Sequence, residues 1–230
     1  MPKETRTVTM TNDWAIWQLA DSAFPSGGFA HSGGLEAAWQ LGQIKDHQSL
    51  ECFLGIYLQQ SGKMALPYLL AVHRIPDEFE ILDRRYDAFV KNHIARKASR
   101  AQGQAILVAA AKAFSIPRLT ELRKSCGDSS CPLHLPTLFG LITRLLEIDA
   151  TQTARLWLHT LLRDLISSAV RLGIIGTLRG QAIQRNMMTT NEQTLQRCLN
   201  LKTEQAAQTA PVMDVLQGTH DRLYSKLFQS

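Results

Sequence analysis

Cysteines and long hydrophobic runs are both scarce in this chain of 230 residues. No apolar stretch approaches the roughly 20 residues that a membrane-spanning helix needs. The first ten residues mix charged residues with threonines and lack the apolar core of a secretory signal. The four cysteines are scattered and do not form the dense pattern of a secreted disulfide framework. We therefore expect a cytoplasmic protein with no membrane partner.

The chain also lacks a large excess of positive or negative charge. Charged residues make up 20% of the chain, the formal net charge is +5, and apolar residues make up 45%, as in an ordinary folded domain. Asp83 and Asp87 dilute the densest basic stretch, residues 84–100, which contains no nucleic-acid-binding motif. We interpret it as a solvated helix face or a surface for an acidic protein partner, and expect no nucleic-acid partner. A helical nucleic-acid-binding module remains an alternative, which a steep loss of binding with added salt would reveal.

The alternating pattern of β-strands is also missing, and helical spacing takes its place. One apolar face recurs at Leu50, Phe53, Leu54, Tyr57 and Leu58. A longer apolar stripe recurs at Leu158, Leu162, Leu165, Ala169 and Leu172. Beside it runs a polar ridge of Arg155, His159, Arg163, Ser167 and Arg171. Small side chains that predict close approach of another helix recur at Ala98, Ala101, Ala105 and Val108. The pattern predicts an all-α, single-domain bundle of roughly ten helices.

Turn-forming residues divide this bundle into segments. We expect loops at residues 25–34, 74–77 and 125–136, a polar break at 186–191, and a last helix that begins near Pro211. Residues 1–12 are predicted to be a flexible segment and residues 13–230 a single domain. No stretch has the composition of a linker between domains.

Four glycines, a proline and a histidine gather in residues 21–36, between two apolar helical segments. Glycine pairs and proline disfavour a helix there, so we predict an ordered loop whose glycines allow close approach of neighbouring elements. The loop is not a Walker loop, because no Gly-Lys-Ser/Thr follows its glycines. It is not a dinucleotide-binding loop either, because it lacks a preceding strand and the Gly-x-Gly-x-x-Gly pattern. Ser32 is expected to cap the following helix, with Glu36 as a possible acidic partner in its first turn.

Asp21, Ser26 and His31 supply the side-chain types of a hydrolytic triad, but no nucleophile elbow accompanies them. We therefore expect no enzymatic activity, and keep a helical enzyme built around His31 as the alternative. Histidines and cysteines show no clustered ligand spacing; even Cys126, Cys131 and His134 lack a second ligand pair. No stably bound metal or cofactor is expected.

The C-terminal segment, about residues 216–230, combines large apolar groups with basic ones. The apolar residues are Leu216, Leu223, Tyr224, Leu227 and Phe228, and the basic ones are His220, Arg222 and Lys226. Two alternatives stay open. The tail docks onto the chain's own core, or it becomes ordered against a partner, where aromatic and basic groups supply much of the binding energy.

Five segments, in this order along the chain, resemble signature segments of the urease accessory protein UreF family. They are residues 21–36, 92–103 with Ala-Ser-x-x-Gln-Gly, 134–140 with His-x-Pro-x-x-Phe-Gly, 169–173 with Val-Arg-Leu-Gly, and 220–230. Because the matches are ordered and spread over nearly the whole chain, together they are far more specific than any one of them.

The resemblance implies an all-helical homodimer that is not itself an enzyme. Such proteins bridge the accessory protein UreD or UreH to the GTPase UreG in a complex that delivers nickel to apo-urease, so nickel would be handled by the complex. The resemblance also implies partner contacts by Phe29, His31 and Ser32 in the loop and by Arg222, Tyr224, Lys226 and Phe228 in the tail. Relatives often carry arginine in place of Lys226, and Tyr or Phe in place of Phe29, so these two contacts are the least transferable.

Overall fold

The computed structural model describes residues 13–125 and 131–230, and every regular element within them is helical. The α-helices are α1 Asp13–Ala20, α2 Leu35–Gln40, α3 His47–Met64, α4 Leu66–Arg74, α5 Phe79–Phe89, α6 His93–Ala113, α7 Pro117–Ser125, α8 Leu135–Leu145, α9 Ala150–Arg171, α10 Thr177–Asn186, α11 Met188–Cys198 and α12 Pro211–Gly218. Short 3-10 turns are η1 Gly28–Ala30, η2 Pro76–Glu78, η3 Thr203–Gln205 and η4 His220–Arg222. The all-α prediction is confirmed. The expected flexible segment 1–12 and Cys126 lie outside the described residues.

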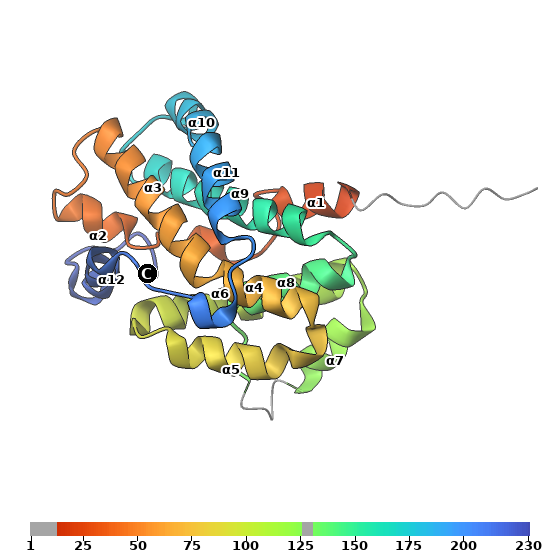
Figure 1. Ribbon diagram of the computed structural model, residues 1–230. Helices are drawn as coiled ribbons and strands as arrows, with labels where there is room; N and C mark the ends of the chain where they lie inside the picture. Colours follow the sequence, from red (N-terminus) through yellow and green to blue (C-terminus); the bar gives the residue numbers. More distant parts are fainter. Residues whose placement is uncertain (1–12, 126–130) are drawn as a thin grey trace, which may run out of the picture.

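One contiguous cluster of buried apolar side chains draws members from each of these α-helices, so the described residues form a single domain. Helix α8 packs most extensively on α4 and α6, and α9 contacts α1, α2, α3, α4, α8, α10 and α11. Figure 1 shows α2 and α12 side by side at one end of the molecule, with the C-terminus close to them. The two segments predicted to contact partners thus meet at this end.

The predicted apolar faces of α3 and α9 are confirmed. Leu50, Leu54 and Leu58 are fully buried on α3, and Leu158 and Leu162 are almost fully buried on α9. Both helices begin at an aspartate whose side chain accepts backbone N–H groups of the first turn, Asp46 before α3 and Asp149 before α9. The residues at which both helices begin therefore follow from local sequence signals.

One detail of the prediction is wrong, and another is only partly confirmed. On α6, Ala101 and Val108 of the small-residue stripe are exposed, and the helix instead turns Gly103, Ile106 and Leu107 inward. The larger apolar residues decide the buried face because they remove more apolar area from water. The polar break at 186–191 is confirmed in position but not in length, since α10 ends at Asn186 and α11 begins two residues later. Polarity in the rest of that stretch marks partial exposure rather than a loop.

Candidate functional site

The Gly-rich loop holds neighbouring elements at close range. Gly33 has φ +61°, and a Cβ added there would lie 2.8 Å from Cε2 of the Tyr57 ring. Gly34 has φ +88°, and its added Cβ would lie 3.3 Å from Gln217 on α12. Both positions therefore need glycine for backbone conformation as well as for space. The expected role of the glycines is confirmed here.

Ser32 does not cap α2, contrary to the prediction. Gly34 occupies the N-cap position, and no side chain caps the helix there. The Ser32 hydroxyl instead donates to the carbonyl of Ser230 at 3.0 Å, and it accepts the Glu36 N–H only at 3.4 Å. The hydroxyl thus has a closer partner in the tail than in the first turn of α2.

Glu36 binds the C-terminal tail from within the protein. Its carboxylate is 2% exposed and accepts the backbone N–H of Leu227 at 2.6 Å and that of Phe228 at 3.2 Å. The imidazole Nε2 of His220, 1% exposed, lies 3.3 Å from the same carboxylate. Three groups of one tail thus converge on a single buried carboxylate. This is docking onto the chain's own core, the first of the two alternatives for the tail.

The last residues of the tail run along the loop. The Gln229 N–H donates to the Ala30 carbonyl at 2.8 Å, and the Ser32 N–H donates to the Ser230 carbonyl at 2.6 Å. His31 Nδ1 and the Ser230 hydroxyl are 2.6 Å apart. Backbone hydrogen bonds and side-chain contacts therefore fix the same few residues.

Arg171, at the end of α9, joins loop and tail. Its guanidinium carbon lies 3.5 Å from the ring centroid of Phe29 and 4.4 Å from that of Phe228, and it donates to the Phe29 carbonyl. A guanidinium between two aromatic faces gains cation–π attraction from each. We call this assembly of Phe29–Ser32, Glu36, Arg171, His220 and Leu227–Ser230 the loop–tail clamp.

The clamp divides the predicted contact residues into two groups. Phe29 is 70% exposed and Tyr224 fully exposed, and Arg222 and Lys226 are exposed as well. Ser32 and Phe228 are buried and His31 is partly buried, so these three hold loop and tail together. Partner contact by any of the seven stays a prediction. Sequence reasoning missed Glu36 and Arg171 as members of the site, although an acidic residue within the apolar run Leu35–Ala38 was a usable signal.

Burial also shapes the acid–base behaviour of the fold. It lowers the pKa of His31, His73, His134 and His159, with neighbouring positive charge adding to the effect at His31 and His159. The unfolded chain therefore binds more protons than the folded one once the pH drops below the ordinary histidine value of about 6.5.

Stability should accordingly be highest above about pH 6.5 and fall as the pH drops through the lowered pKa values. Each histidine contributes only part of the ~1.4 kcal/mol per pH unit of one full proton, because its protonation differs between the folded and unfolded chain by only a fraction of a proton at most pH values in this range. Urea unfolding at about pH 7.5 and about pH 5.5 measures the slope. His159→Gln should make the slope shallower, whereas His47→Gln, an exposed control, should not. Equal slopes in both variants would contradict this account.

A second polar cluster joins α5, α6 and the start of α8. His134 is fully buried, with Nδ1 at 3.0 Å from the Ser99 hydroxyl and Nε2 at 2.9 Å from Oδ1 of Asp87. Arg100 Nε donates to the same Asp87 oxygen at 3.0 Å. Burial raises the pKa of Asp87, but the hydrogen bonds from His134 and Arg100 outweigh it, so the net shift is downward. Asp87 therefore stays ionised and His134 neutral near pH 7.

Asp83 holds the backbone that carries His134. Its fully buried carboxylate accepts the N–H of Leu133 at 2.6 Å, the N–H of His134 at 2.9 Å and the Thr137 hydroxyl. Cys131 Sγ also donates to it, at 3.4 Å. One carboxylate thus shapes the entry to α8, and Cys131 and His134 have partners other than a metal.

The enzymatic alternative around His31 gains no support from the geometry. His31 contacts Ser230, while Asp21 is exposed and accepts the N–H of Ala23. No hydrogen bond joins Asp21, Ser26 and His31 within the described residues. Among those same residues, no group of three or more His, Cys, Asp or Glu side chains is arranged to hold a metal ion. No helix in the described part of the chain is long and apolar enough to span a bilayer.

The fold and the clamp define an all-α protein whose loop and C-terminal tail form one ordered unit. The UreF family model matches residues 44–188. The chain is 36% identical over 231 residues to urease accessory protein F of Oryza sativa subsp. indica, covering 99% of this chain and 88% of that protein. It is 35% identical over 236 residues to urease accessory protein F of Arabidopsis thaliana, covering 99% and 98%. It is 30% identical over 226 residues to urease accessory protein UreF of Trichodesmium erythraeum (strain IMS101), covering 93% and 95%. The chain belongs to the UreF family, which implies a role in urease maturation.

Proposed function

We propose that this chain is a scaffold required for nickel insertion into apo-urease. It bridges UreD or UreH to the GTPase UreG and regulates GTP hydrolysis by UreG, and nickel is the cargo of the complex. The observation that carries the proposal is family membership along 99% of the chain. The lack of a nucleotide-binding motif in the sequence supports it, because the nucleotide chemistry then belongs to the partner.

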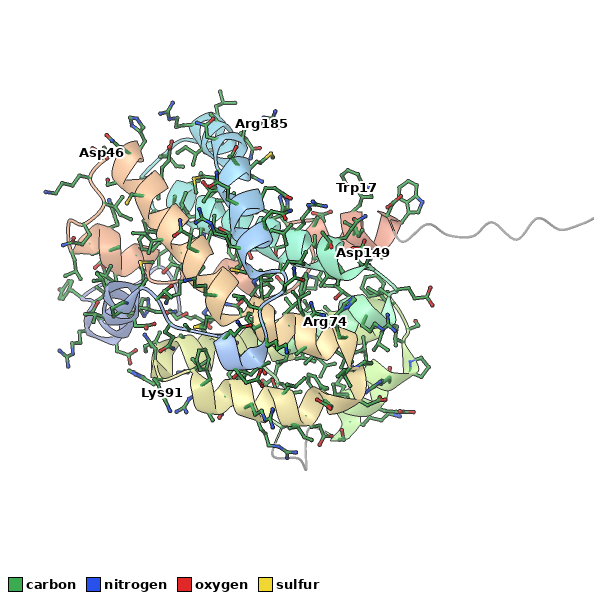
Figure 2. All side chains as sticks on the ribbon, viewed as in Figure 1. Trp17, Asp46, Arg74, Lys91, Asp149 and Arg185 are labelled. Carbon is green, nitrogen blue, oxygen red and sulfur yellow. The ribbon has the colours of Figure 1, made fainter. Side chains whose placement is uncertain are left out.

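The proposal includes a homodimer that acts in the cytoplasm. Trp14 and Trp17 on α1 are 68% and 71% exposed, and Figure 2 shows Trp17 projecting from the helix. A pair of exposed tryptophans is apolar surface that a second copy would cover. Within the described residues, Cys52, Cys131 and Cys198 form no disulfide bond, as is usual in a reducing compartment.

Regulation of UreG follows from linkage. A scaffold that binds one nucleotide state of a GTPase more tightly than the other must shift the population toward that state. The exposed groups beside the clamp, Phe29, Arg222, Tyr224 and Lys226, offer aromatic and basic contacts for such a partner. A scaffold of this kind would retain nickel-loaded UreG until urease is engaged.

Truncation after Gly218 should abolish capture of UreG or of UreD/UreH. The truncation also removes buried Phe228, so it tests folding together with docking. A double variant, Tyr224→Ala with Lys226→Ala, changes only exposed side chains and should weaken capture with unchanged thermal unfolding. Pull-down with each purified partner measures both variants. Capture of both partners at the normal level by truncated and double-variant chains would exclude the tail from docking.

Urease activation in cells that lack this gene tests the function itself. The full chain should restore activity, and the double variant should restore less. A well-expressed full chain that fails beside its cognate partners would refute the proposed scaffold role and leave the family assignment intact.

A further inference from the structure

The Ser99, His134 and Asp87 cluster has the connectivity of a hydrolytic triad. A serine hydroxyl contacts one ring nitrogen at 3.0 Å, and a carboxylate contacts the other at 2.9 Å. The carboxylate is itself fixed by Arg100. In the neutral ring, Nε2–H donates to Asp87 and Nδ1 accepts the serine proton, which is the protonation state of a general base. In the usual triad Nε2 faces the serine and Nδ1 faces the carboxylate. Here the two nitrogens have exchanged these roles, and the proton still passes from the serine to the imidazole.

The serine also lies on the wall of a cavity. This cavity of about 120 Å³ is lined near Ser99 by Tyr86, Gln102, Leu135 and Pro136, and further along by Trp157 and Leu161. A hydrolytic site needs a space of this kind beside its nucleophile, and the small volume admits only a short acyl group. Asp164 and Asp214 also line the cavity and disfavour an anionic substrate.

Donors for a developing oxyanion line the same cavity. The amide of Gln102, one helical turn from Ser99, and the hydroxyl of Tyr86 belong to side chains that line this cavity. The backbone N–H of Leu135, at the N-terminus of α8, reaches the Ser99 hydroxyl oxygen at 3.3 Å. The positive end of this 11-residue helix therefore favours negative charge on the nucleophile oxygen itself, whereas the oxyanion on the substrate carbonyl would be met by the cavity-lining side chains.

We infer that Ser99 is the nucleophile of a hydrolytic site for small carboxylic esters, with His134 as its general base and Asp87 as the positioning residue behind the base. The Ser99 oxygen bonds to the ester carbonyl carbon while its proton passes to His134 Nδ1. Collapse of the tetrahedral intermediate breaks the bond to the alcohol, which leaves with that proton. Water, deprotonated by the same nitrogen, then attacks the acyl carbon, releasing the carboxylic acid and restoring the Ser99 hydroxyl. This activity is separate from the proposed scaffold role and needs none of its partners.

Labelling of the full chain with an alkyl fluorophosphonate tests the inference, since phosphorus bonds to an activated serine oxygen as fluoride leaves. Peptide mass analysis should place the adduct on Ser99, and p-nitrophenyl acetate should be hydrolysed with a burst. Ser99→Ala should abolish both signals, and His134→Gln should slow labelling on the order of 100-fold. The matched controls Ser26→Ala and Ser167→Ala should label like the wild type.

Ser99→Cys guards against a folding artefact, because it keeps the shape of the side chain. In this variant iodoacetamide should modify Cys at 99 faster than the exposed Cys52. An absence of adduct on Ser99 in the folded protein, while a known serine hydrolase in the same tube is fully labelled, would overturn the inference. An adduct on another serine would overturn it as well.

Discussion

Replacing Gly103 by alanine is expected to lower the free energy of unfolding by about 3 kcal/mol or more. A Cβ at this position would lie 1.8 Å from the carbonyl oxygen of Leu133 and 2.9 Å from its carbonyl carbon. The obstructing atoms are backbone, and Asp83 fixes that backbone through the N–H groups of Leu133 and His134. Helix α6 or the entry to α8 must therefore move. The gain of about 1 kcal/mol in helix propensity does not compensate.

Gly55→Ala is the matched control, since Gly55 also lies inside a helix. There the added Cβ meets only Met187 Cε, at 3.8 Å, which is an ordinary van der Waals contact. That variant should be neutral or more stable by up to about 1 kcal/mol. Urea unfolding of the two variants, side by side, measures the difference. If Gly103→Ala proved as stable as Gly55→Ala, the contact between α6 and the entry to α8 would be looser than the structure shows.

The sequence predicted those parts of the fold that depend on local patterns. The faces of α3 and α9 were predictable because their apolar residues recur at helical spacing. The buried face of α6 was not, because its small-residue stripe competes with Ile106 and Leu107, and only packing against α8 decides between them. The polar stretch 186–191 likewise marks the position where α10 ends, but not how short the interruption is, because polar residues are equally at home on the exposed face of α11.

The candidate site divides in the same way. The Gly-rich loop and the tail were predictable as segments, since their composition differs from that of the helices around them. The inward orientation of Ser32 and Phe228 was not predictable, because contacts between residues about 200 positions apart determine it. Ser99 and His134 lie 35 positions apart and meet only when α6 and α8 are packed together. No spacing rule along one chain captures such a contact.

Replacing Glu36 by glutamine should release the tail. One carboxylate oxygen accepts the Leu227 N–H and the other accepts the Phe228 N–H and faces His220 Nε2. An amide would direct its NH₂ group at one of these donors and leave it unsatisfied in a buried site. The expected cost is about 3 kcal/mol for the docked tail, which corresponds to an increase on the order of 100-fold in its open population. Hydrogen exchange at the amides of Leu227 and Phe228 should accelerate by that factor.

Limited trypsin digestion provides a second measurement, because Arg222 and Lys226 lie in the tail. Cleavage after these residues should be faster in Glu36→Gln than in Glu121→Gln, a control at an exposed position on α7. Global unfolding by urea should change less than the tail amides do, since the main core does not depend on the clamp. Amide exchange at residues 227 and 228 that matches the wild type would show that Arg171 and the loop backbone hold the tail without Glu36. If the tail is released, Glu36→Gln still carries the exposed Tyr224 and Lys226. Partner capture by this variant would therefore show whether binding needs an ordered tail or only these side chains.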